Sequence, residues 1–267
     1  MVYLNAIILA IVEGLTEFLP VSSTGHLILV EDYLPVSANP ASKLSFSFIV
    51  LIQLPAIMAV ALYFRKKLWP FGGDEPHRVK TINLWFNIAV AVVPAVVLGL
   101  MFDEVIESAL FWNVPVAIAL VAGGIILIAI ESRRHSIRFE SVHELGFMTA
   151  LYIGFFQCLA MIPGTSRSAA TIIGAMLLGA SRTAAAEFSF FLAIPTMFGA
   201  SLLTVFKSGF AFTAQEWAVI GLGSIVSFAT AYLSVAFLMR YIQRHDFKAF
   251  GWYRIALGAA VLIAHFF

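Results

Sequence analysis

Long apolar runs separated by short polar segments dominate this chain. Five runs approach the about 20 residues that an apolar helix needs to cross a bilayer, and a shorter run closes the chain. The runs are Phe46–Phe64, Trp85–Met101, Pro115–Ile130, Phe188–Phe206, Trp217–Met239 and Tyr253–Phe267. They are too long for half-buried strands and lack the alternating pattern of outer-membrane barrels. The pattern therefore predicts an all-α polytopic membrane protein.

Composition agrees with a protein that lies in a bilayer. Of the 267 residues, 61% are hydrophobic and 12% are charged, and the mean hydropathy is +0.95. Soluble domains are about half apolar and about a quarter charged. A formal net charge of +1 provides no extended field for nucleic acid. We expect membrane lipids as partners and no nucleic acid.

The chain carries an internal repeat whose pieces keep their order. The corresponding pairs are FLPVSS (18–23) with MIPGTS (161–166), FSFIVLIQLP (46–55) with FSFFLAIP (188–195), and IALVAGGIILIA (118–129) with IALGAAVLIA (255–264). Several matches at a slowly drifting offset indicate duplication. We expect a single membrane domain over 1–267, with one repeat over about 1–140 and the other over about 141–267.

Loop charges predict that the second half is inverted. Each half contains one polar segment and three full spans, and an odd number of spans reverses the direction of the next half. Segments 65–80, 131–146 and 240–250 are basic, whereas 103–110 lacks Lys and Arg and 207–216 has Lys207 alone. Basic loops face the cytoplasm, which places both termini outside. This is an inverted-topology internal repeat.

With this parity, neither polar segment can be a full span. We therefore expect each half to be a re-entrant helical hairpin plus three transmembrane helices. Pro20 and Pro163, with the Ser, Thr and Gly residues around them, supply the helix breaks. Non-helical backbone at this depth is tolerated only inside protein or beside a wet cavity. Inverted repeats with broken helices near the midplane are typical of transporters.

Two glutamates precede the first break. Glu13 and Glu17 lie four positions apart, on one face of a helix. Two like charges this close favour a shared proton or a bound cation, and carboxylate oxygens suit Mg²⁺ or Ca²⁺. The alternative is a solvated helix end, but the apolar flanks favour a functional site, since intramembrane acids are usually functional. We predict both as site residues and metal ligands.

A cluster of hydroxyls and a histidine follows Pro20. It consists of Ser22, Ser23, Thr24 and His26. A hydroxyl becomes a good nucleophile when a base takes its proton, and histidine is the commonest such base. We predict a catalytic role for His26. Ser22 and Thr24 could contact phosphate or could simply cap the next helix.

The second polar segment reads PGTSRSAAT from Pro163 and leads into an apolar stretch. Free N–H groups at a helix start bind anions, and the Arg167 fork matches phosphate. The predicted phosphate-binding residues are Ser166, Arg167, Ser168 and Thr171. The alternative for Arg167 is a structural ion pair with Glu13 or Glu17. If the two hairpins meet, their combined side chains suit phosphoryl transfer.

The two segments together resemble a known pair of signatures. EGLTEFLPVSSTGHL (13–27) and PGTSRSAAT (163–171) are similar to the motifs of bacterial undecaprenyl-diphosphate phosphatases, the bacitracin-resistance family. The resemblance spans essentially the whole chain. It implies hydrolysis of undecaprenyl diphosphate to the monophosphate, which recycles the lipid carrier of peptidoglycan synthesis. It also implies an inner-membrane location, a site open to the extracytoplasmic side, and a homodimer.

The resemblance also implies roles for individual residues. Glu13 and Glu17 would hold a divalent metal or organise the diphosphate. Ser23 would be the nucleophile and His26 its partner. Arg167, Ser166, Ser168 and Thr171 would bind phosphate.

A flippase or transporter of the same anionic lipid is the alternative function, because inverted hairpin repeats are typical of transporters. Such a protein needs Arg167 for the phosphate but no nucleophile. Ser23 and His26 beside the acids therefore favour the phosphatase. Attack by Ser23, by His26 or by activated water stays open at this point, as does the identity of the metal.

Overall fold

The computed structural model describes residues 1–30, 33–36, 44–71, 73–110, 112–133, 136–208 and 212–266. Within these ranges the regular elements are helices, apart from one isolated bridge between Phe139 and Ala180. In chain order they are α1 Val2–Thr16, α2 Ser23–Val30, α3 Leu44–Tyr63, α4 Arg65–Leu68, α5 Glu75–Leu110, α6 Asn113–Glu131, η2 Val142–Glu144, α7 Phe147–Cys158, η3 Leu159–Met161, α8 Arg167–Leu177, α9 Arg182–Ser208, α10 Ala214–Tyr241 and α11 Lys248–Phe266. The all-α prediction is confirmed.

Five helices are long and apolar enough to cross a membrane: α5, α6, α9, α10 and α11. They cover five of the six apolar runs. The sixth run falls on α3, whose apolar part Ser47–Tyr63 is shorter. Helix α5 begins ten residues before the predicted run, at Glu75. An acidic residue in the first turn is favourable there because it faces the positive end of the helix dipole. The chain is a multi-pass membrane protein.

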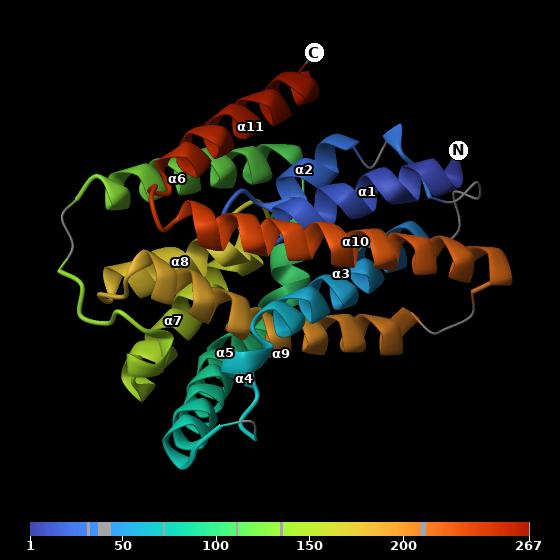
Figure 1. Ribbon diagram of the computed structural model, residues 1–267. Coiled ribbons are helices and arrows are strands. Elements are labelled where there is room, and N and C mark those ends of the chain that lie inside the picture. The colour runs from blue at the N-terminus through green and yellow to red at the C-terminus, as the bar shows by residue number, and fades with distance from the viewer. Residues whose placement is uncertain are drawn as a thin grey trace.

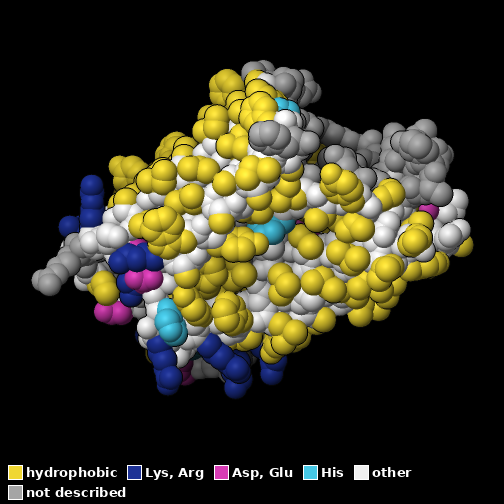
Figure 2. Space-filling view, turned by 90° about the horizontal axis from the view of Figure 1, so that it is seen from above, with side chains coloured by type: hydrophobic (Ala, Val, Ile, Leu, Met, Phe, Trp, Pro, Cys, Tyr) yellow, Lys and Arg dark blue, Asp and Glu magenta, His cyan; other side chains and the backbone are white. Residues whose placement is uncertain are grey.

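The long helices pack in pairs that join distant parts of the sequence. Helix α11 lies along α6, and α10 lies along both α1 and α3 (Figure 1). Phenylalanines fill much of the interior, among them Phe18, Phe188, Phe190 and Phe191, all of them 0% exposed. The outer surface is largely apolar (Figure 2), as a lipid-facing surface requires, and Leu100 and Ile225 are at least 70% exposed.

Lys and Arg gather toward one side of the face seen in Figure 2, along its left and lower edges. Two ion pairs with buried carboxylates lie among the basic segments. Lys67 Nζ lies 2.6 Å from Glu187 Oε1, and Arg182 makes three hydrogen bonds to Glu131. These pairs tie α4 to α9 and α6 to α9.

Two breaks interrupt the helices at the prolines that the sequence singled out. The first separates α1 from α2 around Pro20, and the second separates η3 from α8 around Pro163. Both end on a serine with positive φ, Ser22 at 72° and Ser166 at 68°. Each serine hydroxyl accepts from the backbone N–H three residues later, in Gly25 and Ala169 respectively. The two breaks therefore share one local geometry.

Candidate functional site

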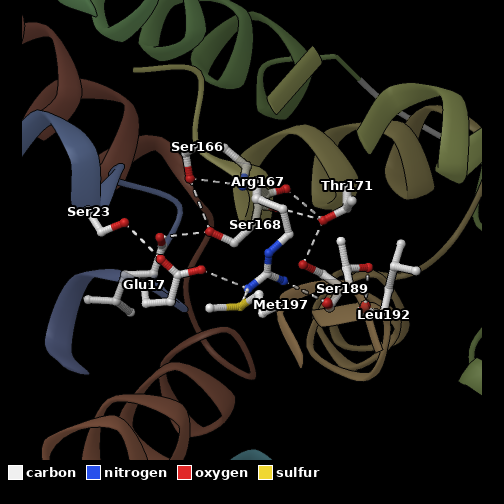
Figure 3. A network of polar contacts seen from close by, with 12 residues as sticks. Glu17, Ser23, Ser166, Arg167, Ser168, Thr171, Ser189, Leu192 and Met197 are labelled. Carbon is white, nitrogen blue, oxygen red and sulfur yellow. Dashed lines mark hydrogen bonds and ion pairs between the residues drawn. The ribbon is translucent and has the colours of Figure 1, made fainter. Parts of the chain in front are cut away.

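The two polar segments meet in the interior through one carboxylate. Glu17, at the end of α1, accepts a hydrogen bond from Ser23 Oγ on Oε2 at 2.7 Å. Its other oxygen, Oε1, lies 3.1 Å from Nη2 of Arg167, the first residue of α8 (Figure 3). The Glu17 and Arg167 side chains are only 10% and 12% exposed. The predicted convergence of both segments therefore exists, and so does the ion pair considered for Arg167.

Further contacts fix the Arg167 guanidinium in place. Nη1 donates to the Ser189 carbonyl at 2.9 Å, and Nη2 also contacts Met197 Sδ at 3.3 Å. The guanidinium lies 5.9 Å from the centre of the Phe18 ring, within range of a cation–π contact. Its Nε is buried without a hydrogen-bond partner among the described residues. One strong donor is thus available for an anionic ligand.

The remaining polar residues of the second segment support the start of α8 (Figure 3). Ser168 Oγ donates to the Leu19 carbonyl at 2.9 Å and lies 3.1 Å from Ser166 Oγ. Thr171 Oγ1 lies 2.7 Å from Ser189 Oγ. Ser168 and Thr171 are 0% exposed and bond to protein groups. In this structure they hold the loops around Arg167 together, and phosphate binding by them stays a prediction.

A cavity of about 130 Å³ lies between the two segments. It is lined by Glu17, Ser22, Ser23, Thr24, Gln53, Ala160, Pro163, Gly164, Ser166 and Arg167. Most of the predicted polar residues therefore share one space. Its lining combines a cation, a carboxylate and several hydroxyls, which can bind an anion and move a proton.

His26 occupies a neighbouring position on α2. Nδ1 lies 2.7 Å from the Ser22 carbonyl, so this nitrogen carries the proton, and Nε2 accepts from the Tyr253 hydroxyl at 2.7 Å. The two rings are nearly parallel, with an interplanar angle of 13°. The hydroxyl of Ser23 donates to Glu17, not to His26. Glu17 is thus the base already in contact with Ser23.

Glu13 lies one helical turn before Glu17, and the Glu17 N–H donates to the Glu13 carbonyl at 3.0 Å. The Glu13 side chain is 0% exposed, and its carboxylate oxygens make no hydrogen bond of ordinary length and angle among the described residues, although the Gln53 side chain lies beside them. Leaving a buried carboxylate without partners costs several kcal/mol, which a proton or a cation would offset.

The residues present fit a hard divalent cation in part. Among the described residues, no three His, Cys, Asp or Glu side chains form a metal-binding group. Mg²⁺ often takes only one or two carboxylates and completes its shell with water and substrate phosphate. Glu13 and Glu17 fit that pattern, because neither Glu13 oxygen makes an ordinary hydrogen bond within the described part of the chain. Substrate oxygens would have to supply the remaining ligands.

Five further residues contact this site without having been predicted from the sequence. They are Gln53, Ser189, Met197, Tyr253 and Arg254. Arg254 could have been predicted from the sequence, because an arginine inside an apolar run costs free energy and usually has a functional role. Gln53 is also a polar residue inside an apolar run, but it is uncharged and indicates a functional role less strongly. Nothing in the sequence distinguished Ser189 or Met197 as site residues.

Comparison with known proteins places this geometry in a family. Residues 6–260 match the family described as bacitracin resistance protein BacA. Undecaprenyl-diphosphatase 1 of Clostridioides difficile is 49% identical over 265 residues, which cover 98% of this chain and 96% of the relative. The undecaprenyl-diphosphatase of Fusobacterium nucleatum is 50% identical, with 96% and 98% covered. That of Enterococcus faecalis is 47% identical, with 97% and 96% covered. The chain belongs to the bacitracin resistance protein BacA family.

Proposed function

We propose that this protein is an integral membrane phosphatase. It hydrolyses undecaprenyl diphosphate to undecaprenyl phosphate and inorganic phosphate, which returns the lipid carrier to peptidoglycan synthesis. The relatives named undecaprenyl-diphosphatase support the substrate. The large apolar surface suits a substrate that is itself a membrane lipid.

The observation that carries this proposal is the position of Glu17 between Ser23 and Arg167. A lipid carrier site needs a cation for the phosphate, and Arg167 provides it, with an Nε donor that has no partner among the residues described. A hydrolase needs in addition a nucleophile beside a base. Ser23 and Glu17 provide that pair at hydrogen-bond distance. A protein that only moved the lipid would have no use for it.

The reaction follows from these contacts. Glu17 accepts the Ser23 proton while Ser23 Oγ forms a bond to the terminal phosphorus. The bond between that phosphorus and the bridging oxygen breaks, and undecaprenyl phosphate leaves with the bonding electron pair. Water then attacks the phosphoserine, releases inorganic phosphate and restores the hydroxyl. Arg167 stabilises the negative charge that develops on the phosphoryl oxygens. Since the Nδ1 proton of His26 is held by the Ser22 carbonyl, His26 orients the turn that carries Ser23.

A divalent cation, Mg²⁺ or Ca²⁺, would be held by Glu13 and Glu17 together with the diphosphate. When bound, it would neutralise phosphate charge and polarise the phosphoryl oxygens. Thr24, Ser22 and Ser166 would contact the phosphate from the walls of the cavity that they line. The support for this arrangement is the buried carboxylate of Glu13, which has no ion-pair partner within the part of the chain that the structure describes.

We also propose how the protein is arranged in the membrane. The protein is an inverted repeat of residues 1–140 and 141–267, and each half has one re-entrant hairpin plus three spans. The matching positive φ angles and hydroxyl caps of Ser22 and Ser166 support the duplication. The gathering of Lys and Arg toward one side of the face in Figure 2 supports a bacterial inner-membrane orientation with the first hairpin open to the extracytoplasmic side.

The deciding experiment separates hydrolysis from transport. Purified protein in detergent is given a C55 diphosphate with Mg²⁺ or Ca²⁺, and inorganic phosphate is measured. We expect the wild-type protein to release inorganic phosphate and the Arg167→Ala variant to release none. A second arm measures translocation of the lipid in proteoliposomes. Translocation without phosphate release would favour the flippase and overturn the phosphatase.

A further inference from the structure

Arg254 is the most deeply buried cation among the residues that the structure describes. It lies on α11, is 0% exposed, and is the largest of the fully buried side chains. Within the described ranges its guanidinium donates to five backbone carbonyls: those of Thr165 at 2.9 Å, Gly164 and Ala119 at 3.2 Å, and Pro20 and Leu120 at 3.4 Å. A buried charge held in this way is costly, so this arrangement needs a functional reason.

Three of the five carbonyls belong to the two loops that form the site. Pro20 lies in the first helix break, three residues before Ser23. Gly164 and Thr165 lie in the second, just before Ser166 and Arg167. One side chain thus connects both loops, while the Ala119 and Leu120 carbonyls anchor it to α6.

We propose that Arg254 is a positioning residue that sets the distance between the two halves of the site. This proposal rests on the proposed phosphatase function, because that reaction depends on the distance from Ser23 and Glu17 to Arg167. Arg254 itself contacts no reacting atom. Its role is to hold the two loops in register so that Glu17 can meet both partners.

The contact with Thr165 has a second consequence. A trans peptide is planar, so its C=O and N–H point in opposite directions. Holding the Thr165 carbonyl toward Arg254 therefore turns the Ser166 N–H away from it. That N–H belongs to the first free groups at the start of α8, where anions bind favourably. Arg254 thus fixes the orientation of one potential phosphate donor.

Glycines on α6 leave the space that the guanidinium occupies. A Cβ at Gly123 would lie 2.2 Å from Arg254 Nη2, and one at Gly124 would lie 3.2 Å from Arg254 Cβ. The preceding residue on α11, Tyr253, bonds to His26. Helix α11 therefore contacts both motifs through two consecutive residues, and α6 accommodates Arg254 through small residues.

The test uses three variants of the full-length protein in detergent. Arg254→Lys keeps the charge but lacks the planar fork. Gly123→Ala keeps the arginine at position 254 but adds a methyl group that displaces its guanidinium. Gly221→Ala is the matched control, because nothing lies within 4 Å of a Cβ there. Helix propensity favours alanine over glycine at both glycine positions, but only Gly123→Ala also crowds a buried side chain, so the folded fraction of each variant is checked by circular dichroism before exchange is measured.

Two quantities are measured: steady-state phosphate release, and hydrogen exchange of peptides that cover 17–25 and 162–168. We expect Arg254→Lys and Gly123→Ala to lower kcat by about 100-fold, the scale of a 1 Å misplacement, with a smaller change in KM. We expect exchange to rise in both peptides and to stay at the wild-type rate within α10. Gly221→Ala should stay within about twofold of wild type, since it displaces nothing.

Two outcomes would overturn the positioning role. Exchange at the wild-type rate in both loops of both variants would show that Arg254 does not hold them. A rise spread evenly over the whole protein would show a general stabilising role only. Hydrogen exchange can be measured whether or not the protein has phosphatase activity. A wild-type protein that releases no phosphate therefore refutes the phosphatase and leaves the positioning role to be decided by exchange.

Discussion

Arg167 and Glu17 form an ion pair across 150 positions of the chain, with Nη2 and Oε1 3.1 Å apart. Each comes from one of the two polar segments, and each side chain is almost buried. Glu17 also accepts a hydrogen bond from the Ser23 hydroxyl, so the proposed anion-binding group and the proposed nucleophile share one carboxylate. A change at either end of the pair should therefore reach both functions.

The first prediction concerns this pair. Glu17→Gln and Arg167→Gln should each lower kcat/KM for a C55 diphosphate by about 100-fold or more, the usual loss for one transition-state contact. The double variant should lose about as much as the worse single variant, because groups that act as a unit are not additive. Lys248→Ala, in an exposed pair with Asp246, serves as the control. A single variant within about threefold of wild type would refute the assignment.

The second prediction concerns the attacking group. Acid quenching with a substrate labelled in the terminal phosphate should trap a phosphoserine in the wild type and none in Ser23→Ala. The variant should also lose at least about 1000-fold in kcat, as loss of a nucleophile does. Ser132→Ala is a suitable control, because that hydroxyl bonds only to its own helix at the end of α6. If Ser23→Ala keeps a tenth of the wild-type activity, water attacks directly with Glu17 as its base.

The third prediction concerns backbone strain at Ser166. Its φ of 68° disfavours any side chain, and its hydroxyl caps α8. Ser166→Gly and Ser166→Ala both lose the cap, but only glycine relieves the strain. Thr213 caps α10 at a φ of −67° and is the reference. The advantage of glycine over alanine in unfolding free energy should be about 1 kcal/mol larger at Ser166 than at Thr213. Equal advantages would mean that the positive φ stores no strain.

The fourth prediction concerns the divalent cation. Chelation should abolish phosphate release, and Mg²⁺ or Ca²⁺ should restore it. Glu13→Gln should raise the half-maximal metal concentration by at least about tenfold, the scale on which even neighbours of metal ligands act. Mn²⁺ binding, followed by electron paramagnetic resonance, gives a readout independent of turnover. Glu144→Gln is the control, because that carboxylate caps η2. Unchanged Mn²⁺ affinity in Glu13→Gln would exclude Glu13 as a ligand.

Sequence patterns predicted the helical class well because they depend on local properties. Uninterrupted apolar runs are long enough to span a bilayer, and five of the six coincide with helices of spanning length. The breaks at Pro20 and Pro163 were predictable from proline followed by Ser, Thr and Gly residues. Proline alone is not sufficient, because Pro55, Pro94 and Pro195 lie inside α3, α5 and α9. Element ends were less certain. Helix α5 runs from Glu75 to Leu110 because polar residues can extend a helix beyond its apolar run.

The site was predictable as a set of residues but not as a set of contacts. Polar side chains inside apolar sequence identified Glu13, Glu17, Ser23, His26 and Arg167. The family resemblance implied His26 as the partner of Ser23. In the structure Ser23 instead donates a hydrogen bond to Glu17, and His26 is hydrogen-bonded to Tyr253. Local spacing could not reveal this, since Tyr253 is 227 positions from His26.

The sequence by itself determined the membrane class, the broken helices and the set of polar residues that meet in the interior, because hydrophobicity, proline geometry and the cost of buried charge act along the chain. Only the tertiary structure decided which carboxylate holds Ser23, that Glu13 is buried without an ion pair among the described residues, and that Arg254 connects both loops. Hydrogen bonds act over about 3 Å. Helix packing alone brings residues that are 90 or 150 positions apart within that distance.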